Sequence, residues 1–462
     1  MPSVMWFRRD LRLRDHPALL AAAADGELLS VFVLDPRLWG PAGPARRAYL
    51  ARSLRALDAG LRETGGRLVV LTGEAEREVP AAARAVGAQR VHVTADFGPL
   101  GSTRDTAVEA ALTAEGRTLV RTDSAYAVPP GTLHTGSGGP FRVYTAFLRR
   151  WAEHGWPAPA PAFTAPEHGW VDGSALDRIT TAELPPTEPP AGMALPEAGE
   201  GAAWRRWRAF VDAEEPGEHG AAGYAERRNR PDLDGTSRMS VHLKWGEVHP
   251  RSLLADLSGP GDGPAALRRE LAWRDFYADV LHHRPDSARD YWRPEFARLD
   301  YDPPGPALDA WREGRTGFPI VDAGMRQLRA SGWMHNRVRM IVASFLVKDL
   351  HVEWQHGARH FQRWLVDGDL ASNSHGWQWV AGSGTDAAPF FRVFNPTGQG
   401  RRFDPDGSYV RRWVPELRDL PAGSDVHDPS PADREATGYP PPLVDHAAER
   451  RETLDRWERM RR

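Results

Sequence analysis

The chain has 462 residues, of which 41% are hydrophobic and 26% are charged, and its formal net charge is −3. At roughly 150 residues per domain, this length predicts two or three domains. The absence of cysteine excludes disulfides, thiolate nucleophiles and cysteine-ligated metal clusters. Because the charges nearly balance, a nucleic acid partner would have to be held by a local basic patch.

Two further features narrow the possible functions. The only lysines are Lys244 and Lys348, and neither follows a glycine, which excludes a Walker A phosphate loop. No run approaches the ~18 uninterrupted apolar residues of a membrane span. The charged start of the sequence is unlike a signal peptide, so we expect a cytoplasmic protein.

The first 125 residues alternate short apolar runs with stretches of helical spacing. The predicted strands are Val4–Phe7, Leu28–Leu34, Arg67–Leu71, Arg90–Thr94 and Arg117–Val120. The predicted helices are Pro17–Ala24, Pro44–Thr64, Glu74–Val86 and Ser102–Glu115. This alternation predicts an α/β domain over residues 1–127 with a doubly wound parallel sheet. Its first turn, Arg8–Arg12, lacks the G-x-G-x-x-G pattern of a standard dinucleotide site.

Residues 128–200 are rich in proline and glycine and are predicted to form a linker, with one helix at Val143–His154. After residue 200 the strand pattern ends and amphipathic helices dominate. Thirteen of the 18 tryptophans lie there. We therefore expect an all-α domain over residues 201–462.

The segment Glu270–Tyr277 has helical spacing. Four of its residues fall at i, i+3, i+4 and i+7 and share one face: Glu270, Trp273, Arg274 and Tyr277. Two interpretations remain open for a face with a carboxylate, two aromatic rings and a guanidinium. It is either a half-buried, salt-bridged surface or the wall of a pocket for a flat ligand.

A second helix is predicted to open at Trp333–Met340, where Asn336, Arg339 and Met340 share a face. A buried asparagine and arginine need partners, which the following segment Asp367–Asn373 could supply. Its D-x-D pair could ligate a metal or a flat amide-rich ring, or only form Asx turns. We assign no metal, because the other acidic ligands of a hard-cation loop are missing.

The segment Thr236–Ser240 offers hydroxyl and backbone N–H groups at a helix start. These groups can bind phosphate oxygens, and Arg238 adds a positive charge. The alternative is that the segment only caps a helix and binds no ligand. The helical region as a whole lacks an activated nucleophile and holds many indoles. That inventory favours a redox cofactor as the source of the chemistry.

These segments resemble motifs of the DNA photolyase/cryptochrome family, and the resemblance extends over nearly the whole chain. The motifs that carry the resemblance, in the family's order, are Trp6–Arg12, Thr236–Ser240, Glu270–Tyr277, Gly332–Met340 and Asp367–Trp379. The sequence is most similar to bacterial cyclobutane pyrimidine dimer photolyases of class I with a deazaflavin antenna. The resemblance implies light-driven repair, in which excited reduced FAD donates an electron to a flipped-out lesion.

The resemblance implies an FAD within the helical domain. The implied flavin-binding residues are Tyr224, Thr236, Ser237, Arg238, Met239, Ser240, Arg274, Arg339, Asp367, Gly368, Asp369 and Asn373. Among them, Asn373 would face the ring nitrogen that is protonated on reduction, as in the repair branch of the family.

The resemblance also implies contacts to the lesion and the DNA. The implied catalytic contacts are Glu270, Asn336, Met340 and Trp379. The implied DNA contacts are Glu270, Trp273, Arg337 and Arg392. The two tryptophans would form aromatic walls for the dimer, and the two arginines would neutralise backbone phosphates.

A chain of aromatic residues is expected to carry electrons to oxidised flavin. The resemblance places Trp377 nearest the flavin, Trp354 in the middle and Tyr301 at the outer end, where the best-known members have tryptophan. Neutral tyrosine is harder to oxidise unless its proton also leaves. Photoreduction would therefore be slower or would use another exit, such as Trp292.

An antenna pigment is common in the family. Folate-binding members carry an Asn-Glu pair after the fourth strand, which the stretch Asp96–Ser102 lacks. The sequence is more similar to the 8-hydroxy-5-deazaflavin type, which implies antenna contacts by Arg46, Asp96 and Lys244. The alternative for Lys244 is a surface lysine at a helix end.

Three alternatives to dimer repair fit the sequence less well. A blue-light sensor on this scaffold usually has a long polar C-terminal extension, whereas this sequence ends in the short charged helix Ala447–Arg462. A (6-4) photoproduct photolyase relies on a histidine pair, and Asn336, Met340 and Trp379 fit the cyclobutane type better. A flavoprotein reductase lacks its nicotinamide fingerprint here. The family suggests a monomer that binds UV-damaged DNA and no membrane.

Overall fold

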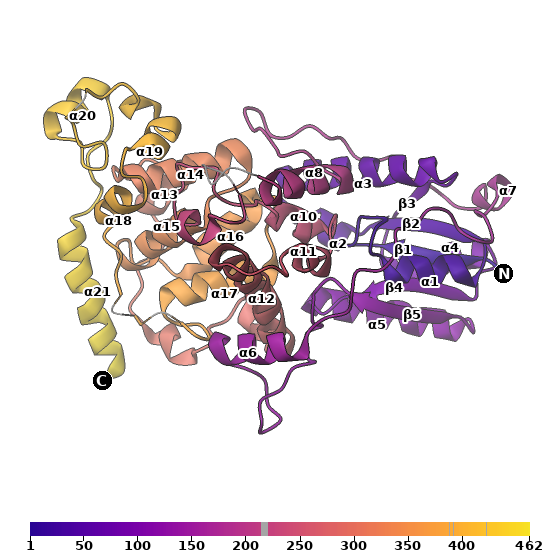
Figure 1. The fold of residues 1–462 in the computed structure, drawn as a ribbon. Helices are drawn as coiled ribbons and strands as arrows, with labels where there is room; N and C mark the ends of the chain where they lie inside the picture. Colours follow the sequence, from indigo (N-terminus) through magenta and orange to yellow (C-terminus); the bar gives the residue numbers. More distant parts are fainter. Residues whose placement is uncertain (214–219, 388, 391, 422) are drawn as a thin grey trace. The chain divides into compact units, whose positions relative to one another are not determined.

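A computed structural model describes residues 1–213, 220–387, 389–390, 392–421 and 423–462 of the chain (Figure 1). They form two compact units. The first unit comprises Met1–Pro190, Pro196–Asp212 and Ser237–Pro285, and the second comprises Ala191–Leu195, Ala213–Thr236 and Asp286–Arg462. The first unit therefore includes helices from the region predicted to be the helical domain. The predicted boundaries at residues 127 and 200 stay predictions.

The first unit contains one sheet of five parallel strands. Its strands are β1 (Ser3–Phe7), β2 (Leu28–Leu34), β3 (Leu68–Thr72), β4 (Arg90–Ala95) and β5 (Thr118–Ser124), in the order β3-β2-β1-β4-β5. The flanking helices are α1 (Pro17–Asp25), α2 (Pro36–Trp39), α3 (Pro44–Glu63), α4 (Ala75–Ala85) and α5 (Pro99–Ala114). The predicted doubly wound sheet is confirmed.

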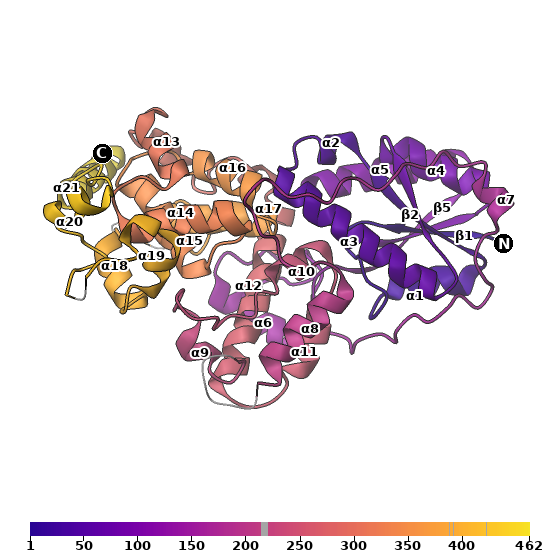
Figure 2. The same ribbon diagram turned by 90° about the horizontal axis from the view of Figure 1, so that it is seen from above.

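Alternate residues of β1 enter different cores because side chains along a strand point to opposite faces. Val4 and Trp6 pack with α4 and α5, whereas Met5 and Phe7 pack with α1 and α3. Figure 2 shows the strands between these two pairs of helices. Both faces of the sheet are covered, so strands β1, β2 and β3 are almost entirely apolar and are recognisable in the sequence.

The rest of the first unit is helical. Its helices are α6 (Tyr144–His154), α7 (Gly173–Leu176), α8 (Glu200–Val211), α10 (Ser240–Trp245), α11 (Pro250–Asp256) and α12 (Asp262–His283). Part of the predicted linker returns to the sheet. The main-chain N of Val171 donates to the O of Leu28 at 3.1 Å, and the N of Leu28 donates to the O of Gly169 at 3.0 Å.

The described part of the second unit contains helices and no strand. Its helices are α9 (Tyr224–Arg227), α13 (Pro306–Glu313), α14 (Pro319–Ser331), α15 (Asn336–Lys348), α16 (Trp354–Trp364), α17 (Leu370–Ala381), α18 (Pro396–Phe403), α19 (Ser408–Trp413), α20 (Pro431–Thr437) and α21 (His446–Arg461). Short 3-10 segments are η1 (Pro285–Ala288), η2 (Pro294–Arg298) and η3 (Pro415–Leu417). The core gathers Trp311, Trp354 and Trp377. Among the described residues, no helix is both long and apolar enough to cross a membrane.

One helix begins later than predicted. Residues 333–335 precede α15, and Nδ1 of His335 accepts a hydrogen bond from the main-chain N of Arg337 at 3.1 Å. This side-chain cap satisfies a first-turn N–H group and fixes the helix start. Asn336 therefore lies in the first turn and is exposed, so the expectation that it is buried was wrong.

Candidate functional site

The face of α12 that was predicted to form either a salt-bridged surface or a pocket wall is the partly exposed side of the helix. The four residues on this face are half-buried: Glu270, Trp273, Arg274 and Tyr277. The residues between them pack into the first unit: Leu271, Ala272, Asp275 and Phe276. The i, i+3, i+4 and i+7 spacing thus groups a carboxylate, a guanidinium and two aromatic rings at one surface.

The indole of Trp273 is held by a stacked tyrosine. The ring centroids of Trp273 and Tyr144, on α6, lie 3.6 Å apart with an interplanar angle of 9°. The Tyr144 hydroxyl donates to the main-chain O of Arg269 at 2.7 Å, which ties the tyrosine to α12. The stack fixes the plane of the indole, as a wall for a flat ligand requires.

Arg274 is fixed by main-chain acceptors. Its Nη1 donates to the O of Ala125 at 2.8 Å, and its Nη2 donates to the O of Leu243 at 3.3 Å. The guanidinium carbon also lies 4.5 Å from the ring centroid of Tyr126. Because a guanidinium has five N–H groups, these contacts orient it and leave donors for an anion.

The predicted phosphate segment leads into α10. Arg238 and Ser240 are exposed, Ser237 is half-buried, and Met239 is buried. These four residues belong to the first unit, whereas Thr236 and Tyr224 belong to the second. The predicted flavin-binding residues are therefore distributed over both units.

In the second unit, Arg339 and Asp367 form the ion pair that the sequence suggested. Arg339 Nη2 donates to Asp367 Oδ2 at 2.8 Å, and Arg339 Nε donates to the main-chain O of Met334 at 2.8 Å. Asp367 Oδ1 is buried and accepts no hydrogen bond from the described residues. Because an unpaired buried carboxylate oxygen is costly, this atom fits a ligand that brings an N–H or O–H group, as FAD does.

Three predicted flavin-binding residues near Asp367 are held by local contacts: Gly368, Asp369 and Asn373. A Cβ added at Gly368 would lie 3.0 Å from Oε1 of Gln362, so the turn has little room for a side chain. Asp369 Oδ1 accepts from the main-chain N of Ser372 at 3.0 Å and caps α17. Asn373 is buried, and its Nδ2 donates to the O of Ala358 at 3.0 Å.

The predicted lesion contacts of the second unit lie at partly open positions. Asn336 is exposed, and Met340 and Trp379 are half-buried against the apolar core. Trp377 is buried on another side of α17. An added Cβ at Gly357 would lie 2.1 Å from Cη2 of Trp377, so the indole rests directly on the α16 backbone.

A further aromatic ring, that of Tyr291, lies between two residues of the predicted electron route. The ring centroids of Trp354 and Tyr291 lie 6.2 Å apart, and those of Tyr291 and Tyr301 lie 6.3 Å apart. Trp354 is buried, and Gly357 lies one turn further along α16. Trp377 therefore packs beside the helical turn that begins with Trp354.

Arg337 lies near three other arginines: Arg228, Arg392 and Arg402. Burial, and then Arg228, Arg392 and Arg402, lowers the pKa of Arg337 to about 10. The guanidinium carbons of Arg337 and Arg402 lie 4.5 and 5.1 Å from the ring centroid of Phe403. Arg337 Nη2 also donates to Oδ1 of Asn229 at 2.7 Å. Mutual repulsion of these cations favours a polyanion as their partner.

A small pocket lies at the carboxyl ends of β1 and β4. Its lining residues are Arg8, Arg9, Asp10, Thr94, Ala95, Asp96, Ala125 and Tyr126. The strand order reverses between β1 and β4, and ligands of doubly wound sheets bind at this switch point. Of the predicted antenna residues, Asp96 lines the pocket, whereas Arg46 and Lys244 do not. Arg9 Nε donates to the O of Lys244 at 3.3 Å.

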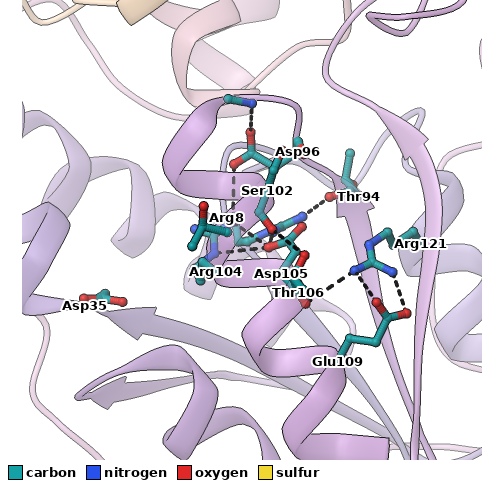
Figure 3. A network of polar contacts seen from close by, with 12 residues as sticks. Arg8, Asp35, Thr94, Asp96, Ser102, Arg104, Asp105, Thr106, Glu109 and Arg121 are labelled. Carbon is teal, nitrogen blue, oxygen red and sulfur yellow. Dashed lines mark hydrogen bonds and ion pairs between the residues drawn. The ribbon is translucent and has the colours of Figure 1, made fainter. Parts of the chain in front are cut away.

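A network of arginines and carboxylates supports this pocket (Figure 3). Arg8 pairs with Asp105, and Arg104 Nη2 lies 3.0 Å from Asp105 Oδ1 and 3.3 Å from Asp96 Oδ2. Burial by itself would raise the pKa of Asp96, but Arg104 and other nearby arginines lower it. The pocket therefore keeps a charged carboxylate at its edge.

Several residues of these groups were missed in the sequence. Tyr144, Tyr291 and Glu353 make their contacts with residues far away in the chain or on other elements, so no local spacing reveals them. Arg228 and Arg402 belong to Arg-Arg pairs, which are a visible but nonspecific sign of an anion-binding surface.

Two family models match most of the chain. One, described as "DNA photolyase", matches residues 3–167. The other, described as "FAD binding domain of DNA photolyase", matches residues 267–459. A relative from Streptomyces griseus, named deoxyribodipyrimidine photo-lyase, is 42% identical, with 99% of each chain covered.

Solved structures of the same family are similar over the whole chain. A class III photolyase from Agrobacterium tumefaciens has a TM-score of 0.87 and 37% identity, with 100% of this chain and 98% of that chain covered. An archaeal photolyase from Sulfolobus tokodaii, described as containing two FAD molecules that imply a novel light-harvesting cofactor, has a TM-score of 0.81 and 29% identity. It covers 99% of this chain and 100% of its own.

A parallel α/β sheet and a helical region that matches an FAD-binding domain define a flavoprotein, and a small pocket lies at the carboxyl ends of β1 and β4. The chain belongs to the DNA photolyase/cryptochrome family. The predicted family and its FAD cofactor are thus confirmed. The assignment to class I and the individual site residues stay predictions.

Proposed function

We propose that this chain is a photolyase that repairs cyclobutane pyrimidine dimers in DNA by light-driven electron transfer from reduced FAD. The observation that carries the proposal is the buried Asp367 carboxylate. Arg339 satisfies one of its oxygens, and the other is left for a ligand donor within the matched FAD-binding domain. Monomeric state and cytoplasmic location stay predictions of the sequence.

When bound, reduced FAD supplies the electron that opens the cyclobutane ring in light. Asp367 Oδ1 would accept a hydrogen bond from the flavin, and Arg339 holds the carboxylate in the required orientation. Because Asn373 Nδ2 is anchored on the O of Ala358, its Oδ1 is the atom that can accept from the ring N–H formed on reduction. That hydrogen bond would stabilise the reduced cofactor.

The dimer would be held by the predicted lesion contacts. Trp273, braced by Tyr144, and Trp379 would stack against the flipped-out bases, at roughly 1–3 kcal/mol per base. Glu270 and Asn336 would hydrogen-bond the pyrimidine edges, and Met340 would contact the apolar side. Asn336 is exposed and the other four contact residues are half-buried, which supports a role in ligand contact rather than in the core.

The DNA backbone would be bound by Arg337 and Arg392 together with Arg228 and Arg402. Their shared positive charge supports this role, because phosphates relieve the repulsion that lowers the pKa of Arg337. Such binding weakens as the salt concentration rises.

For the antenna we propose 8-hydroxy-5-deazaflavin, bound beside Asp96 in the pocket at the carboxyl ends of β1 and β4, with folate disfavoured. The position at the switch point and the charged Asp96 support a polar aromatic pigment there. Extraction of the pigment and its absorption spectrum distinguish deazaflavin from a second flavin or a folate. Arg46 and Lys244 would contact only a part of the pigment outside this pocket.

Irradiated oligothymidine tests the repair activity directly. Purified protein with chemically reduced FAD should restore thymine absorbance under blue light and leave it unchanged in the dark. Protein that binds FAD and restores no absorbance in either condition would overturn the proposal in favour of a sensor. Substrate that contains only (6-4) photoproducts should remain unrepaired.

A further inference from the structure

Tyr291 lies between two members of the predicted electron route. Its ring centroid is 6.2 Å from that of Trp354, nearly perpendicular to it at 83°, and 6.3 Å from that of Tyr301, nearly parallel at 18°. All three rings belong to the second unit and to one apolar cluster. An electron that moves from Tyr301 to Trp354 would therefore pass the Tyr291 ring.

Tyr291 has a proton acceptor. Its hydroxyl donates to Oε1 of Glu353 at 3.0 Å. Among the described residues, the Tyr301 hydroxyl has no hydrogen bond to a carboxylate. Burial, together with Tyr301 and Glu353, raises the pKa of Tyr291, so this phenol stays protonated in the resting protein. Loss of its proton must therefore accompany its oxidation.

Trp354 cannot release a proton in the same way. Its Nε1 is buried and has no hydrogen-bond acceptor among the described residues. A radical cation formed on this indole would keep its proton and its oxidising strength. The neighbouring phenol, with a carboxylate on its hydroxyl, is the group that can be oxidised without building up a buried positive charge.

We propose that Tyr291 is the electron donor to oxidised Trp354 and that Glu353 accepts the Tyr291 proton in the same step. The inference rests on the proposed function, because photoexcited oxidised flavin, through Trp377, is the oxidant that takes the first electron from Trp354. Trp354 then regains one electron from Tyr291. The phenolic O–H bond breaks, its proton forms an O–H bond on Glu353 Oε1, and a neutral tyrosyl radical remains.

The surroundings of Tyr291 allow the tyrosyl radical to be reduced again after this step. Glu353 is half-buried, so its proton can exchange with water. A thiol reductant in solution, itself oxidised by one electron, restores Tyr291 when the proton returns from Glu353. Tyr301, half-buried and stacked on Tyr291, is placed to relay that electron. The tyrosine at position 301 would thus act after Tyr291 rather than as the first phenol oxidised.

Flash absorption and electron paramagnetic resonance of the FAD-loaded, oxidised protein test this inference. The wild-type protein should show a tryptophan radical that decays as a tyrosyl radical appears, with a slower transfer in D₂O. Tyr291→Phe retains the ring but lacks the O–H group, so it should lose the tyrosyl signal and prolong the tryptophan signal. Glu353→Gln should slow the transfer by about 100-fold, as expected for loss of a positioned proton acceptor.

Tyr301→Phe is the matched control, because it removes a phenol from the same stack and leaves the Tyr291–Glu353 pair intact. It should preserve the first tyrosyl radical. A signal that survives in Tyr291→Phe and disappears in Tyr301→Phe would overturn the inference. Light-driven repair by chemically reduced wild-type protein needs no photoreduction, so its failure would count against the proposed function alone.

Discussion

Asp367 receives a hydrogen bond from Arg339 at 2.8 Å, and its side chain is 2% exposed against 24% for the arginine. The two residues lie on different elements, at 339 in α15 and at 367 before α17. The pair thus places one buried negative charge where α15 approaches the start of α17. Because Oδ1 of Asp367 has no donor among the described residues, this pair offers a buried acceptor to a ligand.

Asp367→Asn should weaken FAD binding. A hydrogen bond to a charged group is worth about 1.5–3 kcal/mol, so affinity should fall roughly 10- to 100-fold. Fluorescence titration of the FAD-free protein with FAD measures the change. The control is Glu416→Gln, which removes another carboxylate paired with an arginine, Arg326, at 2.6 Å in the same unit. Equal losses in both variants would contradict a specific role for Asp367.

Tyr144→Leu should weaken binding of dimer-containing DNA by releasing the Trp273 ring. Truncation of a stacking residue costs roughly 1–3 kcal/mol per base, or about 5- to 150-fold in Kd. Tyr144→Phe keeps the stack and loses only the hydrogen bond to Arg269, so it should bind nearly as the wild type does. Gel-shift titrations with damaged and undamaged oligonucleotides measure the effect. If Tyr144→Leu binds damaged DNA as the wild type does, Trp273 does not need the stacked Tyr144 ring to bind the lesion.

Strands β1, β2 and β3 could be predicted because both faces of the sheet are covered and these strands form almost continuous apolar runs. The observed strand Leu28–Leu34 has the predicted bounds. Helix ends were less accurate. The His335 cap that delays α15 depends on one side-chain rotamer, which hydrophobic spacing does not encode.

The site was predictable where its residues are close in sequence. The face of α12 follows from helical spacing, and the Arg339–Asp367 pair follows from the need to satisfy buried charge. The Trp273–Tyr144 stack joins residues 129 positions apart on separate helices, so it arises only from tertiary packing. The same holds for Tyr291 and Glu353, 62 positions apart.

Arg402→Ala should reduce the salt dependence of DNA binding. Each phosphate contact contributes a slope of about −0.9 in log K against log salt for a duplex, so the slope should become shallower by about one. Arg401→Ala is a matched control from the adjacent position, because Arg401 Nε donates to Asp425 Oδ2 at 2.8 Å and its charge is already compensated. Binding titrations at several salt concentrations give both slopes. Identical slopes in the two variants would mean that Arg402 does not contact DNA phosphates.

Asp275 should make the stability of the protein depend on pH. This carboxyl is buried, and its Oδ2 accepts from the main-chain N of Val128 and from Nε1 of Trp151, each at 3.0 Å. Burial raises its pKa from 3.8 to about 6, although Arg274, 3.7 Å away, opposes the shift. The folded state therefore binds the proton more tightly than the unfolded state does.

The sign of the effect follows from that difference. The contribution of Asp275 to the free energy of unfolding is fully present below pH 3.8 and is lost as the pH rises through 6. A shift of about two units corresponds to about 3 kcal/mol. Asp275→Asn retains an oxygen acceptor and cannot titrate, so urea unfolding should show its stability rising relative to the wild type between pH 4 and about pH 7. A difference that stays constant with pH would mean that Asp275 has the same pKa in both states.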